Sequence, residues 1–471
     1  MDENELKMRR RRERLRQERL RRKKRKRAIL IGCMITALLL IVLLLWALIA
    51  GIVSLVNSPG KKEVKAYLDQ LYESEIEDTE KQDTAFSEWF YDTYKREVKK
   101  KLFKAAEDGD LTTPEVYEAA GESMHVLADR YRGRLKDAGT AAKHQIYLRE
   151  GKRNGIAEIS IGGDLCLTED GFVIDHYDEV DENLETCISP ELLDVMNQSD
   201  IFYINHEYTI SDRGEPLAGK AYTFRAEPKR MNILQEMGTD IVSLANNHVF
   251  DYGADALNDT VDLLEDAGIA YVGGGRNIEE AKRPVYFIVN GIKIGFVAAS
   301  NGETKNHTPQ AAEDTPGILQ AYDTAEYNQV IQNAAKECDY LIAYIHWGTE
   351  DSSTYNEDQQ NWGREFLESG ADIVVGGHPH VLQGIEYVEG KPIVYSLGDF
   401  WFNHETKFTG LLKLTVGMDG LKEMSFVPAL QEDYETRYLD DGDAQKELYN
   451  FLEGLSSNVE IDDHGIITEK R

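Results

Sequence analysis

Metal-capable side chains follow apolar runs at five separate places in this sequence. Each run is short and rich in Ile, Val or Leu. The polar groups that come after the runs are Asp164, Asn205 with Glu207, Asn247 with His248, His346, and the pair His378 and His380. Imidazole and carboxylate together suit Mn, Fe, Zn or Ni, whereas an all-oxygen set would suit Mg or Ca. Such a set can polarise a phosphoryl or carbonyl oxygen and lower the pKa of a bound water.

The elements that must position these groups alternate between strands and helices from about Gly155 to Pro428. Candidate strands are 156–161, 201–204, 241–244, 285–289, 292–298, 340–345, 373–375 and 393–396, and candidate helices are 228–237, 254–267, 324–336 and 357–368. Asn290-Gly291 between two apolar runs predicts a type I′ hairpin. This pattern indicates an α/β domain with a mixed sheet. The carboxyl ends of its parallel strands would bring the polar groups to one edge.

The charge of the chain is unevenly distributed. The formal net charge is −31, yet residues 1–27 carry +10 and residues 28–471 carry −41. A strongly acidic outer portion argues against nucleic acid as a partner, and against an acidic polymer unless cations mediate the contact. Three cysteines lie beyond residue 57, namely Cys166, Cys187 and Cys338. Their odd number and spacing argue against a disulfide scaffold.

The N-terminal region is typical of a membrane anchor. Residues 28–57 hold no charged side chain, and as a helix they would reach roughly 40 Å, enough to cross a bilayer. The run is too long for the apolar core of a signal peptide, which favours an uncleaved anchor over a cleaved leader. The basic residues just before it predict a cytoplasmic N-terminus and an extracellular remainder, and they also suit contact with anionic lipid.

Five segments follow from these patterns. Residues 58–150 are predicted to be helical, because Val64, Tyr67, Leu68 and Leu71 share one helix face. After Pro428 the chain is acidic and rich in tyrosine, with one further helix expected at about 443–455. The predicted segments are a basic cytoplasmic tail (1–27), a transmembrane helix (28–57), a helical stalk or docking segment (58–150), an α/β domain (151–430) and an acidic C-terminal extension (431–471).

Six motifs occur in a fixed order along the α/β domain. They are Gly163-Asp164-Leu165-Cys166-Leu167, Asn205-His206-Glu207, Asn246-Asn247-His248, His346-Trp347-Gly348, Gly377-His378-Pro379-His380 and Tyr395-Ser396-Leu397-Gly398-Asp399-Phe400. Together they resemble the capsule synthesis protein CapA (PgsA-type) family, over about residues 155–428. That family is associated with bacterial poly-γ-glutamate synthesis or export and belongs to the calcineurin-like metallophosphatase superfamily.

The resemblance implies a four-layer metallophosphatase-like sandwich, in which two mixed sheets pack between helices. It also implies a centre for one or two divalent ions, with Glu207 in the bridging position and His248 as the group that protonates a leaving oxygen. Asn205 and Arg225 are candidates for substrate binding. The implied metal ligands are Asp164, Glu207, Asn247, His346, His378 and His380.

Three positions depart from the family pattern. Cys166 occupies the place of a histidine ligand, either as a thiolate ligand or as a buried inert thiol. His206 replaces a hydrophobic residue, and Asp399 stands where the family often has asparagine. The second ion is therefore expected to be weak or absent.

Three further features have two interpretations each, and His404 has one. Arg225 either clamps a phosphate or carboxylate with its bidentate fork or makes a surface ion pair. Trp347 either lines the cleft or packs in the core, and His404 is a second candidate for the cleft. Gly273-Gly274-Gly275 lacks the Lys-Ser/Thr of a P-loop, so a turn is favoured over a phosphate cradle.

Three functions fit these features. The first is a metal-dependent hydrolase that acts on a phosphoester or, less readily, an amide. The second is a non-catalytic part of a membrane-bound complex for synthesis or export of poly-γ-glutamate or another acidic polymer, with cations bridging the polymer to the acidic domain. The third is an envelope phosphatase unrelated to polyglutamate, since a fold does not fix a function.

Overall fold

The computed structural model describes residues 145–149, 151–153, 155–169, 173–302, 305 and 307–470. The predicted tail (1–27), the predicted span (28–57) and nearly all of the predicted helical segment (58–150) lie outside the described residues. Within the described ranges, no helix is long and apolar enough to cross a membrane.

A seven-stranded mixed sheet supplies one side of the candidate site. In spatial order its strands are β1 (Gln145–Arg149), β9 (Val285–Val289), β10 (Ile292–Ser300), β12 (Tyr340–His346), β13 (Ile373–Gly377), β15 (Lys391–Val394) and β14 (Ile385–Val388). β10, β12, β13 and β15 run parallel, whereas the pairs β9–β10 and β14–β15 are antiparallel. Asn290 and Gly291 join β9 to β10 with φ values of 51° and 81°, which confirms the positive-φ turn predicted there.

An eight-stranded mixed sheet supplies the other side. Its order is β19 (Glu435–Tyr438), β18 (Gly420–Glu432), β17 (Lys407–Gly417), β2 (Ile156–Leu165), β3 (Ile201–His206), β6 (Ile241–Ser243) and β7 (Ala270–Val272), and β16 (Asp399–Trp401) pairs with β2. The strands from β2 to β7 are parallel, and those from β17 to β19 are antiparallel.

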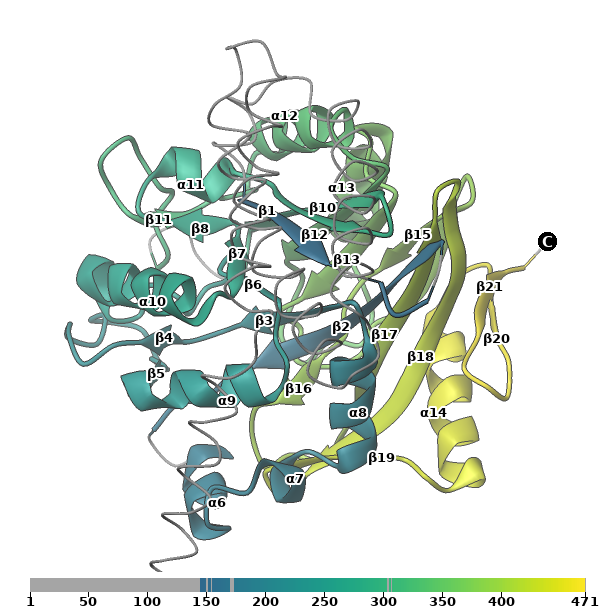
Figure 1. Cartoon of the computed structure of the whole chain (residues 1–471), viewed down its shortest axis with the longest axis horizontal. Coiled ribbons are helices and arrows are strands. Elements are labelled where there is room, and N and C mark those ends of the chain that lie inside the picture. The colour runs from purple at the N-terminus through teal and green to yellow at the C-terminus, as the bar shows by residue number, and fades with distance from the viewer. Residues whose placement is uncertain are drawn as a thin grey trace, which may run out of the picture. The chain divides into compact units, whose positions relative to one another are not determined.

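Helices lie on the outer faces of both sheets, as Figure 1 shows. They are α6 (Val173–Glu179), α7 (Leu184–Cys187), α8 (Pro190–Gln198), the 3₁₀ turn η1 (Pro228–Arg230) with α9 (Met231–Glu236), α10 (Gly253–Ala267), α11 (Ile278–Lys282), α12 (Thr324–Ala335) and α13 (Glu357–Glu368), whereas α14 (Gly442–Leu455) packs against β14 and β18. Three short ribbons complete the domain: β4–β5 (Thr209–Ile210 with Arg225–Ala226), β8–β11 (Gly274–Gly275 with Gly317–Ile318) and β20–β21 (Val459–Ile461 with Ile467–Glu469).

Three apolar clusters define the layers. The central one lies between the sheets, where Tyr203 of β3 stacks on Phe296 of β10 with ring centroids 5.7 Å apart. A second cluster joins the outer face of the eight-stranded sheet to α6, α8, α9 and α10. A third joins the outer face of the seven-stranded sheet to α12 and α13. The order helices, sheet, sheet, helices is the four-layer arrangement that the sequence predicted.

The predicted elements agree with the structure over most of the domain. Strand 285–289 and helix 357–368 match residue for residue, and α13 begins with the capping box of Asn356 and Gln359. The long hairpin β17–β18 was not among the predicted strands. It spans Lys407–Glu432 with apolar side chains on alternate positions and joins β2 by antiparallel pairing.

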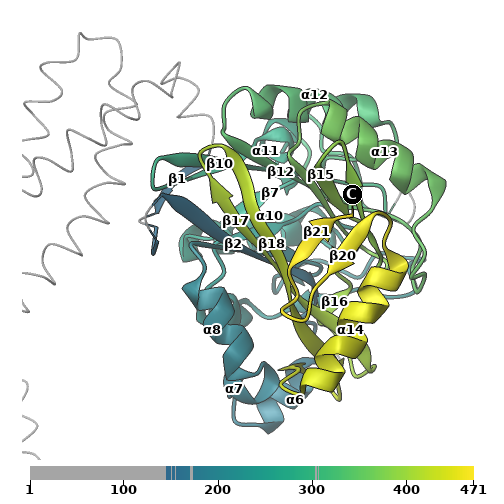
Figure 2. The ribbon, with the colours of Figure 1, turned by 90° about the vertical axis from the view of Figure 1, so that its right-hand side faces the viewer.

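The two ends of the domain differ from those predicted from the sequence. β1 falls inside the segment predicted to be helical, because Gln145–Arg149 pairs with β9. At the other end, the predicted extension packs on the domain. α14 and the β20–β21 ribbon contribute Leu448, Leu452 and Val459 to the central cluster, and Figure 2 shows them beside β17 and β18.

Candidate metal centre

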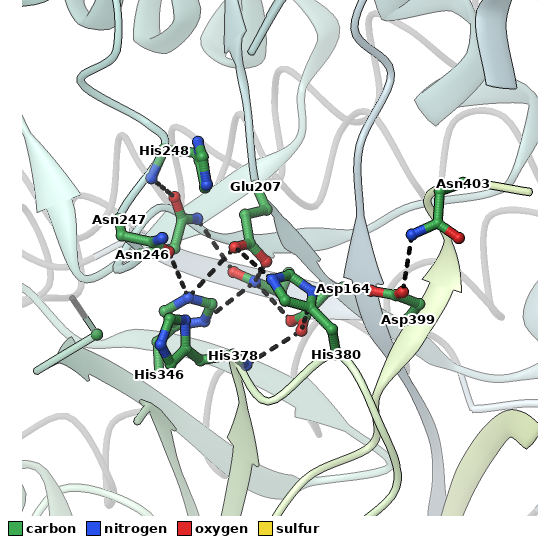
Figure 3. Close-up of polar contacts among 12 residues, drawn as sticks. Asp164, Glu207, Asn246, Asn247, His248, His346, His378, His380, Asp399 and Asn403 are labelled. Carbon is green, nitrogen blue, oxygen red and sulfur yellow. Dashed lines mark hydrogen bonds and ion pairs between the residues drawn. The ribbon is translucent and has the colours of Figure 1, made fainter. Parts of the chain in front are cut away.

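The six predicted metal ligands meet where parallel strands of both sheets end. Figure 3 shows them around one small region. Asp164 lies at the end of β2, and Glu207 and Asn247 follow β3 and β6. His346 ends β12, and His378 and His380 follow β13. Strands of both sheets therefore point their carboxyl ends at the same place, as expected of ligand sites in α/β folds.

One set of ligands is fully buried and is called here the His346 group: Glu207, Asn247, His346 and His378. The Nε2 atom of His346 lies 2.7 Å from Asn247 Oδ1 and 3.4 Å from Glu207 Oε1. Potential ligand atoms of Glu207, His346 and His378 all fall within 4.8 Å of one another. The four side chains are at most 3 % exposed. Their types and spacing are those of a transition-metal site.

The second set shares Glu207 and is called here the His380 group: Asp164, Glu207 and His380. His380 Nε2 lies 3.8 Å from Glu207 Oε1, and its Nδ1 lies 3.7 Å from Asp164 Oδ2. Asp399 Oδ1 accepts a hydrogen bond from His380 Nδ1 at 2.8 Å. A carboxylate on one ring nitrogen fixes the tautomer and directs the other nitrogen at a metal. Asp399 thereby orients Nε2 of His380 towards Glu207.

Amide side chains hold the carboxylates in place. Asn205 Nδ2 donates to Asp164 Oδ1 at 2.8 Å and to Glu207 Oε2 at 3.1 Å. Asn246 Nδ2 donates to Asn205 Oδ1 at 3.1 Å, which sets the orientation of that amide. Asn205 is completely buried. The prediction that Asn205 binds substrate is therefore corrected: its side chain positions the ligands and does not face solvent.

Glycines let the ligand strands approach closely. A Cβ atom on Gly377 would lie 2.6 Å from Asp164 Oδ1 and closer still to the Tyr344 hydroxyl. A Cβ on Gly302 would lie 2.8 Å from His346 Cδ2. The main chain of the ligand loop is unusual too, since His378 and His380 have φ values of 94° and 57°. Non-glycine residues rarely adopt such values, and they cluster at functional sites.

Burial and neighbouring charges shift the pKa values of four of the six ligands. Burial, followed by the neighbouring Glu207 carboxylate, raises the pKa of Asp164 to about 7, and burial raises the pKa of Glu207 to about 8. Burial alone would lower the pKa of His380, but the carboxylates of Asp399, Glu207 and Asp164 outweigh it and raise that pKa to about 10. Burial and the adjacent imidazoles hold the pKa of His378 well below its usual range.

Two buried polar atoms of the centre fit a bound cation. Glu207 Oε1 and His378 Nδ1 have no hydrogen-bond partner within the part of the chain that the structure describes. A buried carboxylate oxygen without a donor is costly unless a cation satisfies it. The donor set of imidazole, carboxylate and amide oxygen is suited to a divalent transition ion. The residues present therefore fit a divalent metal.

His248 lies beside this centre and is part of a second buried cluster. Its Nδ1 is 2.6 Å from Asp251 Oδ2, and its ring stacks on Phe224 with centroids 4.2 Å apart. The Lys220 ammonium is 2.7 Å from Asp251 Oδ1 and also donates to the backbone carbonyl of Asn247. With Asp251 accepting a hydrogen bond from Nδ1–H, Nε2 is the ring atom that can give or take a proton. This is the arrangement of a general acid oriented by a carboxylate.

Several of these residues were not predicted from the sequence. Lys220 and Asp251 support His248, Tyr344 contacts Asp164, and Lys407 is 3.0 Å from Asp399 Oδ2. Glu350 groups with His378 and His380 within 4.8 Å. Asp251 follows His248 by three residues and Glu350 follows His346 by four, so short spacing was an available signal. Lys220 lies in a loop and Lys407 begins β17, and neither position shows any such pattern.

Arg225 links two loops in the structure. Its Nη1 atom donates to the backbone carbonyls of Arg213 and Gly214, and its guanidinium lies 4.1 Å from the centre of the Tyr252 ring. None of its contacts within the described residues reaches a metal ligand. Its role in substrate binding stays a prediction.

The remaining alternatives from the sequence are resolved as structural roles. Cys166 is buried in the outer apolar cluster of the eight-stranded sheet, and burial raises the pKa of its thiol. His206 is buried against Tyr208, and burial lowers its pKa to about 3. Trp347 packs in the core and donates to the Tyr395 carbonyl at 2.9 Å, while His404 packs on Tyr434.

The glycine run at 273–275 forms a turn and a short strand. Gly274–Gly275 pairs with Gly317–Ile318. A Cβ on Gly273 would lie 2.5 Å from Ala245 Cβ and 2.8 Å from Ala298 Cβ. These glycines allow close packing between the sheets, which agrees with the turn favoured over a phosphate cradle.

Comparison with known proteins assigns the chain to a family. Two mixed sheets between helices, with imidazoles and carboxylates gathered at strand ends, define an α/β protein with a candidate metal centre. Residues 159–404 match the family described as bacterial capsule synthesis protein PGA_cap. The chain belongs to this family. The resemblance to the capsule synthesis family that the six motifs indicated is thereby confirmed.

Relatives with established names share part of their length with this chain. It is 31% identical over 215 residues to the PGA biosynthesis protein CapA of Bacillus subtilis (strain 168), which covers 45% of this chain and 56% of the relative. It is 30% identical over 229 residues to the capsule biosynthesis protein CapA of Bacillus anthracis, which covers 47% and 53%. The match therefore spans a little over half the length of each relative.

Solved structures offer a more distant likeness. The NAD nucleotidase of Haemophilus influenzae aligns with a TM-score of 0.32 and 14% identity, over 66% of this chain and 64% of the nucleotidase.

Proposed function

We propose that this chain takes part in the synthesis or export of a poly-γ-glutamate capsule, through a divalent-metal centre on a domain held outside the cell. Family membership and the names of the two CapA relatives support the process. The uncharged run at residues 28–57 and the basic residues before it support single-pass anchoring with the N-terminus inside. The convergence of the His346 and His380 groups carries the proposal.

The charge of the domain explains why a metal centre would matter to this function. Residues 28–471 carry −41, and poly-γ-glutamate is itself a polyanion. Contact between them requires cations, because like charges repel over the Debye length. A divalent ion at the centre would act as a Lewis acid on a phosphoryl or carboxylate oxygen. The protein's own residues would hold the ion and orient the acidic chain.

Binding of polymer to the purified full-length chain tests this proposal. In mild detergent with Mn²⁺ present, the chain is expected to bind poly-γ-glutamate, and a chelator should abolish the binding. The variant His346→Ala should bind weakly in Mn²⁺, whereas Asp259→Asn, whose carboxylate pairs with Arg213 outside the centre, should bind like the wild type. Equal binding by His346→Ala, or in chelator, would contradict the proposal.

Hydrolysis at the same centre is a second candidate function, and the His248–Asp251 pair favours it. A buried imidazole with its Nδ1 held by a carboxylate at 2.6 Å is suited to proton transfer to a leaving oxygen. General acid groups of this kind contribute about 10²–10⁴-fold to rate. Substrates to compare are simple phosphoesters and poly-γ-glutamate.

Variants of His248 and Asp251 test the hydrolytic function. Hydrolysis should require metal and fall at least about 100-fold in His248→Ala, while metal binding stays unchanged. Asp251→Asn should lower the rate and alter its pH profile, since the tautomer of His248 would no longer be fixed. A rate that is indifferent to both variants would rule out this role for His248.

A further inference from the structure

The two ligand groups of the proposed metal centre are unequal in number. The His346 group offers four side chains, but the His380 group offers three, of which Glu207 is shared. Cys166, two residues beyond Asp164, is buried in the apolar cluster on the outer face of the eight-stranded sheet. Protein sites for transition ions usually supply three or four ligands and leave solvent positions for the rest. The His380 group is therefore the half with room for a further protein ligand.

Glu350 is a carboxylate placed at this open side. Its side chain, that of His378 and that of His380 offer ligand atoms that lie within 4.8 Å of one another. Glu350 is exposed, while His378 is only 3 % exposed, so the carboxylate reaches the centre from the solvent side. The Glu350 carboxylate makes no hydrogen bond or ion pair within the described parts of the chain. Its charge is also close enough to act on Glu207.

The backbone around Glu350 is fixed against the ligand loop. Trp347 N–H donates to Gly377 O at 3.1 Å, and Asp351 N–H donates to Pro379 O at 2.9 Å. These two bonds bracket Glu350 and hold it beside His378 and His380. Gly348 has a φ of 92°, which glycine adopts readily, and it allows the turn that follows His346. A Cβ atom at this position would also lie 2.9 Å from the Gln359 side chain. A mobile side chain on a fixed loop can close on an ion without rearrangement of the fold.

We propose that Glu350 is a metal ligand of the His380 group and supplies the carboxylate that completes it from the solvent side. This inference rests on the proposed metal centre. It assigns the loop between β12 and α13 a direct part in metal binding. A carboxylate that is exposed before binding would also make the affinity of this group weaker and more adjustable than that of the buried His346 group.

Metal binding by the full-length chain in mild detergent tests the proposal. After removal of metal with a chelator, Mn²⁺ is titrated and the free ion is followed by electron paramagnetic resonance, with bound metal counted by elemental analysis. Glu350→Gln is expected to weaken one class of Mn²⁺ site at least about tenfold, or about 1.4 kcal/mol. Asp351→Asn, the adjacent exposed carboxylate, is the matched control and should bind like the wild type. Melting of the metal-free variants should be unchanged.

A double-mutant cycle decides which group Glu350 serves. With His380→Ala, the added change Glu350→Gln should weaken binding no further, whereas with His346→Ala it should still cost its full factor. Wild-type affinity in Glu350→Gln, or coupling to His346 instead of His380, overturns the inference while the metal centre stands. A wild-type chain that binds no Mn²⁺ overturns the metal centre and this inference with it.

Discussion

The His346 group and the His380 group share one carboxylate but are built differently. The His346 group is enclosed, and its side chains are at most 3 % exposed. The His380 group reaches the surface, where the His380 side chain is 15 % exposed and is held by Asp399, which in turn contacts Lys407. One half is therefore fixed by burial at strand ends, and the other by loops that arrive from distant parts of the chain. The first should bind metal tightly and the second adjustably.

Glu207 links the two halves, so its loss should have the largest effect. In Glu207→Gln the side chain keeps its shape and its contact with Asn205, but the charge shared by His346 and His380 is lost. Mn²⁺ affinity is expected to fall at least about 100-fold, or about 2.7 kcal/mol, at every site. Isothermal titration of the full-length chain measures this. Loss of Mn²⁺ affinity at only one site would show that Glu207 serves a single group, which would contradict its role as the shared carboxylate.

Asp399 is a partner of the His380 group alone. Among the six metal ligands it contacts only His380 in the contacts that the structure describes. Asp399→Asn removes the charge that fixes the tautomer of His380 and leaves Lys407 without its buried partner. Changes to such outer partners cost about 10–100-fold in metal affinity. We expect about a tenfold loss at the His380 group and none at the His346 group.

Combining Asp399→Asn with His346→Ala, or with His380→Ala, shows at which ligand group Asp399 acts. The effect of Asp399→Asn should persist in His346→Ala and vanish in His380→Ala, as seen by Mn²⁺ titration. Persistence of the effect in His380→Ala would mean that Asp399 acts elsewhere, by way of Lys407 or Asn403.

The raised pKa values of three ligands predict a pH dependence for the metal-free chain. The folded-state pKa values of Asp164 (about 7), Glu207 (about 8) and His380 (about 10) all lie above their ordinary values of 3.8, 4.5 and 6.5. Each group therefore binds its proton more tightly in the folded state. Its stabilising contribution is complete below the ordinary pKa and is lost as the pH rises through the folded value. The lowered pKa of His378 changes the free energy of unfolding only below about pH 6.5, where the imidazole of the unfolded chain binds a proton.

Melting curves between pH 6.5 and 8.5 check this sign. The melting temperature of the metal-free chain should fall by about 2–4 °C over that interval. Saturating Mn²⁺ should remove most of the fall, because the ion binds the deprotonated carboxylates. Asp164→Asn should flatten the metal-free curve. A melting temperature that rises across the interval would contradict the assigned directions.

The difference between the halves also explains how far the sequence could be interpreted. Strand ends followed by Asp164, Glu207, Asn247, His346 and His378 are a local pattern, and this pattern predicted a mixed sheet with metal-capable side chains at one edge. The four layers and the full ligand set were implied by the family resemblance. The outer support of the His380 group is not local. Lys407 begins a hairpin more than two hundred residues after Asp164, and Asp399 is placed by pairing of β16 with β2.

Two side chains show what such local patterns leave open. Asn205 was a candidate for substrate binding, and in the fold its buried amide contacts Asp164 and Glu207. Arg225 was assigned by its chemical type alone, and the fold sends its guanidinium to Tyr252 and two backbone carbonyls. Side-chain direction at a known chain position depends on tertiary packing, which the spacing of motifs does not encode.

Cys166→Ala has the smallest expected effect, and it tests whether the two ligand groups differ in ligand number. If the thiol is only a filler of the outer cluster, Cys166→Ala removes one buried atom and costs about 1 kcal/mol in unfolding free energy, with no change in metal affinity at either group. Substitution of Co²⁺ in the wild type should then give no thiolate-to-metal charge-transfer band. Such a band, lost in Cys166→Ala, would make the thiol a ligand of the His380 group. That group would then be complete without Glu350, and the asymmetry between the two halves would lie in ligand type instead of ligand number.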